Sequence, residues 1–145
     1  MQSMKFKHSE DGTAAVAQLK RSWSNTISRF TDLSEHWEDM AKRMLKLAIT
    51  ISLNEQDKLQ FSGRAFDKDF TAKLTSTIVG DQLLGKVTVI TPDPVTGRNR
   101  MACSFFISPD GTVTSDDGAQ LLSLRDDNEP SYRLFCLFIE TLAAA

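Results

Sequence analysis

The stretch VAQLKRSWSNTISRFTDLSEHWEDM, residues 16–40, decides which fold this sequence can adopt. Its large apolar residues recur every seven positions, and a second set follows three positions later, as at the a and d positions of a heptad. Only Thr26 breaks the second set, and Ile27 stands one place later. This period predicts a long amphipathic helix. The two sets are Val16, Trp23, Phe30, Trp37, Met44 and Ile51, and Leu19, Leu33, Met40 and Leu47.

The heptad pattern lies in a segment without helix breakers. Neither proline nor glycine occurs between Thr13 and Leu53, so residues 12–53 can form one helix. About 40 helical residues extend about 60 Å, whereas a sheet of four or five strands is about 20 to 25 Å wide. A single helix therefore extends past its own sheet and leaves part of its apolar stripe uncovered.

A helical hairpin accounts for the same residues in a different way. Asp32 and Glu35 have the spacing of a capping box, and Thr31 or Asp32 is a suitable N-cap, so residues 13–30 and 33–52 would form two helices. The bulk of two tryptophans in a narrow seam also favours the hairpin. The unbroken heptad phase favours the single helix, because a turn gives no reason for the phase to continue. Both interpretations stay open from the sequence.

Residues 54–145 have the pattern of an antiparallel sheet followed by a helix. Segments of alternating apolar and polar residues are joined by short polar connections, which is typical of a meander. Residues 119–125 suit either a helical turn or an edge strand. The expected strands are 58–64 (ending near Gly63), 70–79, 85–91, 99–107 and 112–114.

The last helix is apolar around most of its circumference. Asn128 is a suitable N-cap, and Glu129 and Pro130 suit a first turn, so we expect the helix over residues 131–144. Because it is too short to span a bilayer, we expect it to pack on the sheet. The predicted fold class is α+β: a polar lead over residues 1–11, a long helix or helical hairpin, four to five antiparallel strands, and an apolar C-terminal helix.

Composition and charge exclude several classes of protein. The chain has 145 residues, of which 41% are apolar and 25% charged, with a net charge of −2, as in one ordinary globular domain. No apolar run approaches the roughly 18 residues of a membrane span. Polar residues follow the N-terminal lysines, which argues against a signal peptide and for the cytoplasm, or the nucleus in a eukaryotic source. Cys103 and Cys136 lie in apolar runs and predict two free thiols.

The residue types that catalysis and metal binding need lack the spacing of known sites. Glu35, His36 and Asp39 are potential metal ligands on one helix, but without an HExxH motif or a cysteine pair they are typical of a solvated face. Neither a G-x-S-x-G elbow nor a glycine-rich phosphate loop occurs. We therefore expect no catalytic residue, no metal and no cofactor, and the sequence favours a non-enzyme without settling the question.

Two arginines follow a loop that connects two predicted strands. Residues 91–97 contain two prolines and a glycine, and Arg98 and Arg100 come directly after them. Arginine suits a bidentate contact with a carboxylate or phosphate, and binding residues concentrate on loops held by a rigid scaffold. We predict Arg98 and Arg100 as partner-binding residues. Nucleic acid is not favoured as the partner, because the basic residues are not interleaved with aromatic ones.

The apolar stripe predicts function most directly, because an uncovered stripe would form a large exposed apolar patch unless a second protein covers it. We predict a non-enzymatic protein–protein interaction module of adaptor, chaperone or scaffold type, forming a homodimer or higher oligomer or binding another protein. Two alternatives are a small-ligand-binding or enzymatic domain, with a pocket between sheet and C-terminal helix, and a nucleic-acid-associated protein. The expected contact residues are Val16, Leu19, Trp23, Ile27 and Phe30.

The predicted order of elements is compatible, at the level of fold alone, with two families. These are the RWD-like domains of some coiled-coil kinetochore and adaptor proteins, and the small acidic dimeric chaperones of secretion systems. The YPxxxP-type signature of many RWD domains is missing from this sequence. The analogy therefore assigns no site residue.

Overall fold

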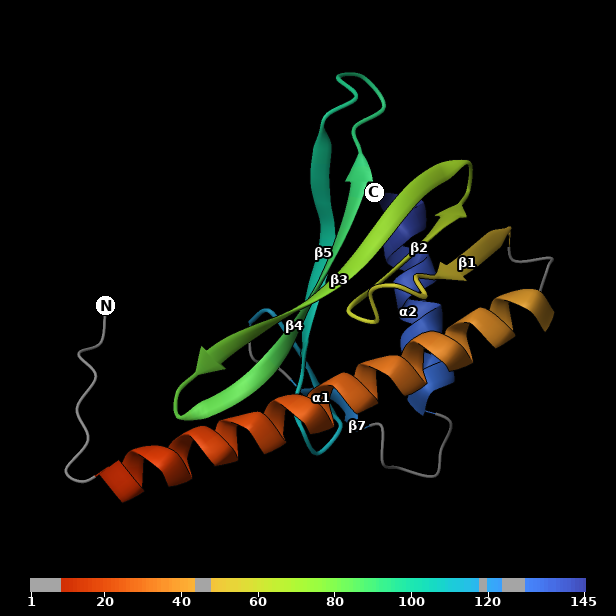
Figure 1. Ribbon diagram of the computed structural model, residues 1–145. Helices are drawn as coiled ribbons and strands as arrows, with labels where there is room; N and C mark the ends of the chain where they lie inside the picture. Colours follow the sequence, from red (N-terminus) through yellow and green to blue (C-terminus); the bar gives the residue numbers. More distant parts are fainter. Residues whose placement is uncertain (1–8, 44–47, 118–119, 124–129) are drawn as a thin grey trace.

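The computed structural model describes residues 9–43, 48–117, 120–123 and 130–145. In this part of the chain, two helices accompany one antiparallel sheet in which each strand pairs with the next (Figure 1). The predicted α+β class and the meander connectivity are confirmed. The elements are α1 (Ser9–Arg43), β1 (Ile49–Leu53), β2 (Gln60–Ala65), β3 (Lys68–Val79), β4 (Gln82–Pro92), β5 (Asn99–Ile107), β6 (Thr112–Ser115), β7 (Gln120–Ser123) and α2 (Pro130–Ala144).

Residues 9–43 form one uninterrupted helix, so the single-helix interpretation is confirmed and the helical hairpin is wrong. At 1.5 Å per residue, α1 is about 52 Å long. The capping signal near Asp32 does not start a new helix, because Phe30 and Leu33 on either side of it are both buried in the core. A turn at this point would remove one of them from the sheet.

The predicted helix extended too far, because residues 49–53 form the strand β1. Ile49 and Ile51 are buried while Thr50 and Ser52 are exposed, which is the alternation of a strand. The seven-residue spacing that placed Ile51 in the heptad was therefore coincidental. The other late heptad members, Met44 and Leu47, lie outside the described residues.

The sheet has seven strands rather than the four to five that we expected. β1 is one of the additional strands. The other is β7, in the segment that the sequence left open between a helical turn and an edge strand; it pairs with β6.

The strand β2 passes through Gly63 instead of ending there, and it continues to Ala65. A Cβ atom at Gly63 would lie 2.0 Å from the backbone oxygen of Thr50 and 2.7 Å from the ring of Phe70, so only glycine fits between these neighbours. The chain reverses after Ala65 through two residues with positive φ, Phe66 and Asp67.

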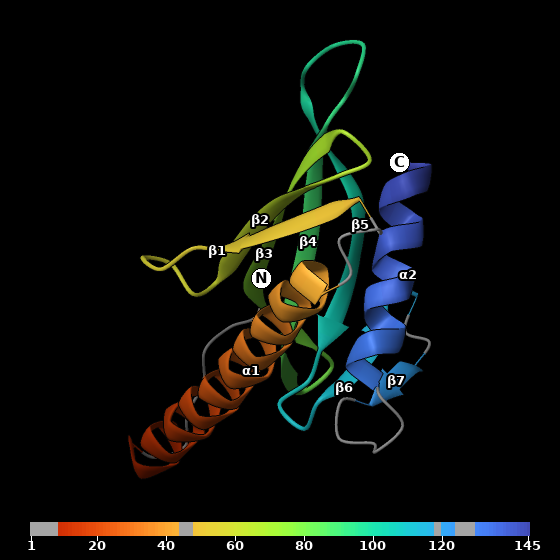
Figure 2. The same cartoon turned by 90° about the vertical axis from the view of Figure 1, so that its right-hand side faces the viewer.

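The core is built around Trp37 of α1, which contacts aromatic rings from α2 and from the sheet. Its ring centroid lies 4.9 Å from that of Phe138, 5.4 Å from that of Phe135 and 6.1 Å from that of Phe61. The indole Nε1 also donates a hydrogen bond to the backbone oxygen of Ser131 at 3.0 Å. These contacts fix the two helices to each other and to the sheet (Figure 2).

The helix α2 packs its apolar face into this core, as expected. Leu134 and Leu142 are buried together with the two phenylalanines of α2. The Lys68 ammonium donates to the backbone oxygens of Leu142 and Ala145, at the helix end where the dipole favours a cation. The predicted cap residues Asn128 and Glu129 lie outside the described residues. Among the described helices, none has both the length and the apolar character to cross a membrane.

The helix α1 lies directly against β4 at Gly85. A Cβ atom at this position would lie 2.6 Å from Thr26 Cγ2 and 2.6 Å from Leu74 Cδ1. Thr26 itself is fully buried, and its hydroxyl donates to the backbone oxygen of Ser22 at 2.8 Å. The residue that breaks the heptad is thus a small residue at a close contact between helix and sheet.

Gly85→Ala is expected to lower the free energy of unfolding by about 1 to 3 kcal/mol, because the added methyl group overpacks the helix–strand contact. Thr26→Ser removes Cγ2 and keeps the hydroxyl, so the double variant should lose less than the sum of the single losses. Urea unfolding followed by circular dichroism measures the stability of Gly85→Ala, Thr26→Ser and the double variant. A Gly85→Ala protein as stable as the wild type would contradict this close contact.

Phe138→Ala is expected to cost about 3 to 5 kcal/mol of stability, because it removes a buried ring that contacts Trp37. The neighbouring Leu137 is exposed on the same helix, so Leu137→Ala serves as the matched control and should change stability by about 0.5 kcal/mol or less. Equal losses in the two variants, measured by the same unfolding experiment, would show that α2 is packed through a different face.

Candidate functional site

The predicted contact residues on α1 become progressively more exposed towards its N-terminus. Trp23 and Ile27 are half-buried and pack against the core. Leu19 is 41% exposed and Val16 is 60% exposed. We call Val16, Leu19 and Trp23 the helix stripe. It continues the row of apolar residues that fills the core, towards the N-terminus of α1.

Phe30 lies inside the core and not on this surface. Its side chain is 0% exposed, and its ring stacks on that of Phe61 with the centroids 5.7 Å apart. Because the chain's own sheet covers it, Phe30 is not accessible to a second molecule. We therefore leave it out of the contact surface, although the heptad pattern placed it there.

A second exposed apolar surface lies at the end of the β3–β4 hairpin, and the sequence analysis missed it. Ile78 is 58% exposed, and its cross-strand partner Leu83 is half-buried. Residues 70–79 were expected to bury every second residue, Ile78 included. The available signal was an apolar pair, Ile78 and Val79, directly before the turn at Gly80. We call Ile78 and Leu83 the hairpin row.

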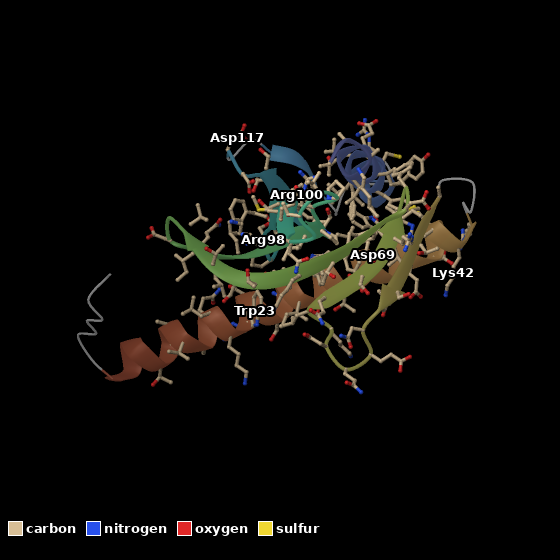
Figure 3. The ribbon with its side chains drawn as sticks, turned by 90° about the horizontal axis from the view of Figure 1, so that it is seen from above. Trp23, Lys42, Asp69, Arg98, Arg100 and Asp117 are labelled. Carbon is tan, nitrogen blue, oxygen red and sulfur yellow. The ribbon has the colours of Figure 1, made fainter. Side chains whose placement is uncertain are left out.

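The helix stripe and the hairpin row belong to two arms that extend to the same side of the molecule (Figure 1), and the view of Figure 3 shows the two arms separating towards their ends. The arms meet where Thr26 of α1 lies against Gly85 of β4. Figure 3 shows Trp23 on α1 close to this junction.

The predicted partner-binding arginines lie on the hairpin of β4 and β5, which extends away from the rest of the sheet (Figures 1 and 2). The Arg100 guanidinium pairs with the carboxylate of Asp93, with Nη1 and Oδ2 3.7 Å apart. Arg98 is exposed, and the structure gives its side chain no ion pair within the described residues. Val95 at the tip is 90% exposed. The side chains of Arg98 and Val95 are thus both exposed near the tip of this hairpin.

The side chain of Asp93 orders this tip. Its Oδ1 atom accepts hydrogen bonds from the backbone N–H groups of Val95 at 2.8 Å and Thr96 at 3.0 Å. The N–H groups of Thr96 and Val95 hold the pKa of the Asp93 carboxyl below its ordinary value, and the charge of Arg100 lowers it further. Gly97 supplies the positive φ that closes the turn.

Two of the three residues considered as metal ligands, His36 and Asp39, have other partners. Asp39 pairs with Arg43 at 2.7 Å, and His36 Nδ1 lies 2.8 Å from the hydroxyl of Ser131. Within the described residues, no three His, Cys, Asp or Glu side chains gather where they could hold a metal ion. His36 and Arg29 line an open cavity of about 250 Å³ beside Ser131.

The two cysteines are free, as expected, and half-buried. Burial raises the pKa of the Cys103 thiol to about 11, and the nearby Asp116 carboxylate adds to the increase. At neutral pH this thiol is protonated and therefore a poor nucleophile.

Lowering the pH is expected to loosen the β4–β5 tip. The pKa of Asp93 is lower in the folded protein, so its contribution to order is fully present above the ordinary aspartate value near 3.9 and is lost as the pH falls through the lowered value. Amide hydrogen exchange of Val95 and Thr96 should accelerate there, and in Asp93→Ala at any pH. Asp93→Asn keeps the acceptor oxygen and is the matched control. Unchanged exchange in Asp93→Ala would contradict this role.

Comparison with known proteins does not alter this description. No family model matches the chain, and no curated protein and no solved structure matches it either.

Proposed function

We propose that this chain is a non-enzymatic interaction module that self-associates through the helix stripe of α1. The observation that carries the proposal is the exposure of Val16 and Leu19, at 60% and 41%, on the same row of α1 that fills the core further along. Within the described residues, the helix extends past the sheet that covers the rest of this row.

The chemistry of the stripe supports a protein partner. Removing apolar surface from water stabilises an association by roughly 25 cal/mol per Å². The exposed Val16 and Leu19 lie one turn apart, and the indole of Trp23 follows in the same row, so the three side chains form one continuous apolar surface on a helix. Such a surface is suited to another apolar surface of protein and offers no group for chemistry.

The interior of the domain supports the same proposal. A ligand-binding or enzymatic domain would need a pocket between the sheet and α2. In this chain, aromatic rings occupy that space: Phe70 lies 5.3 Å from Phe138, and Phe61 lies 6.5 Å from it. The larger described cavities open at the surface instead, such as one of about 310 Å³ between α1 and the loop after β1.

The tip of the β4–β5 hairpin is retained as a proposed contact for a different protein. Arg98 can bind a carboxylate of a partner, and the neighbouring Val95 can enter an apolar pocket beside it. Arg100 is already paired with Asp93 and is proposed to orient the tip.

The double variant Val16→Asp, Leu19→Asp is expected to convert a dimer or higher oligomer to monomer, because it places two charges in the proposed contact. The matched control is Ala14→Asp, Gln18→Asp, which puts the same charges on the opposite face of α1, where both residues are exposed. Sedimentation velocity at tens of micromolar measures the mass of each particle. A monomeric wild type, or two double variants that behave alike, would refute self-association through this stripe.

A further inference from the structure

We infer that the helix stripe of one copy packs on the hairpin row of a second copy, and reciprocally, so that the two chains exchange their arms about a two-fold axis. This inference rests on the proposed self-association and names the surface that receives the stripe. It makes Ile78 and Leu83, on the β3–β4 hairpin, the partners of Val16 and Leu19 across the interface.

The hairpin row lies on the face of the sheet that receives a helix. Side chains alternate between the two faces of a strand, so Ile78 shares a face with Leu74, and Leu83 shares a face with Gly85 and Val87. Leu74 and Val87 are 1% exposed. Leu74 pairs with Val87, and Ile78 pairs with Leu83, in a register without a shift. The same face of the sheet therefore continues to the end of the hairpin. The hairpin row is thus the uncovered end of a helix-binding face.

The chain's own helix leaves this end open. Close packing at Thr26 and Gly85 sets the point where α1 crosses the hairpin, and beyond it the two arms separate in the view of Figure 3. Ile78 is 58% exposed, whereas Leu74, four residues earlier on the same face, is 1% exposed, which agrees with this separation. The helix stripe and the hairpin row are thus two apolar surfaces that lie apart within one copy.

A pairing of two helix stripes alone would be too small. Phe30, Leu33 and later heptad residues are used in the core, so about one heptad is free, whereas a stable coiled coil needs about three. A stable dimer buries about 800 Å² per partner, which is more than the one exposed heptad of each helix supplies. Exchange of the arms adds the surface of two hairpins to that of two helices.

The charges at the borders of the two surfaces are complementary. Lys20 follows Leu19 at the edge of the helix stripe, and Asp81 lies in the turn between Ile78 and Leu83. Both side chains are exposed, and neither has an ion pair within the described part of the chain. When the stripe lies on the hairpin row of a second copy, the ammonium and the carboxylate meet at the rim.

The first test compares two neighbouring residues on opposite faces of β3. Ile78→Asp is expected to shift the dimer to monomer in sedimentation velocity. Val79 is exposed to a similar extent, at 50%, but points to the other face, so Val79→Asp is the matched control and should leave the dimer intact. If Ile78→Asp also leaves the dimer intact while Val16→Asp, Leu19→Asp disrupts it, the exchange of arms is refuted and self-association stands. A monomeric wild type refutes both.

The second test traps the contact itself. A chain with Leu19→Cys is mixed with a chain of different mass carrying Ile78→Cys under mild oxidation, and the disulfides are located by peptide mass spectrometry. The exchange of arms predicts a mixed disulfide between the two chains, which is necessarily intermolecular. A disulfide only between two Leu19→Cys chains would show pairing of two helices, and the inference would be wrong.

Discussion

The close contact of Thr26 with Gly85 sets the position of α1 against the sheet. A Cβ atom at Gly85 would lie 2.6 Å from Thr26 Cγ2, so the helix can lie this close to β4 only because the strand has no side chain there. On one side of this contact the helix directs Phe30 and Trp37 into the core. On the other side it separates from the β3–β4 hairpin, and apolar residues of both arms stay in contact with water. The part of α1 that follows this crossing point is buried in the core, whereas Val16 and Leu19, which precede it, stay exposed.

The core explains why we locate function at the surface. Trp37 contacts two rings of α2 and one of β2, and its indole N–H is paired with the backbone oxygen of Ser131. Interiors packed in this way leave little room for a ligand. The described cysteine with a shifted pKa is protonated at neutral pH, so it adds no reactive group. The surface features that remain are two apolar arms and a polar hairpin tip.

The two projecting hairpins differ in chemistry, and this difference suggests a division of roles. The β3–β4 hairpin ends in Ile78 and Leu83, which continue a face that accepts a helix. The β4–β5 hairpin ends in a tip ordered by hydrogen bonds to Asp93, with Arg98 and Val95 exposed on it. In our proposals the first hairpin receives a second copy of the chain, and the second contacts a different protein.

The sequence by itself determined the meander, the apolar C-terminal helix and the free thiols, because each follows from a local period or from residue type. It left one long helix and a helical hairpin open, and only the structure shows the single helix α1. It also indicated that α1 would extend past its sheet, since length per residue is fixed. The sequence analysis placed residues 49–53 in the helix instead of in β1. The seven-residue spacing at Ile51 also fits a strand, in which Ile49 and Ile51 are buried and the residue between them and the residue after them are exposed. Only the tertiary structure decided that Phe30 is buried while Val16 is exposed, and that Ile78 is uncovered. Those outcomes depend on where α1 crosses β4, and that point is set by the contact of two residues far apart in the chain.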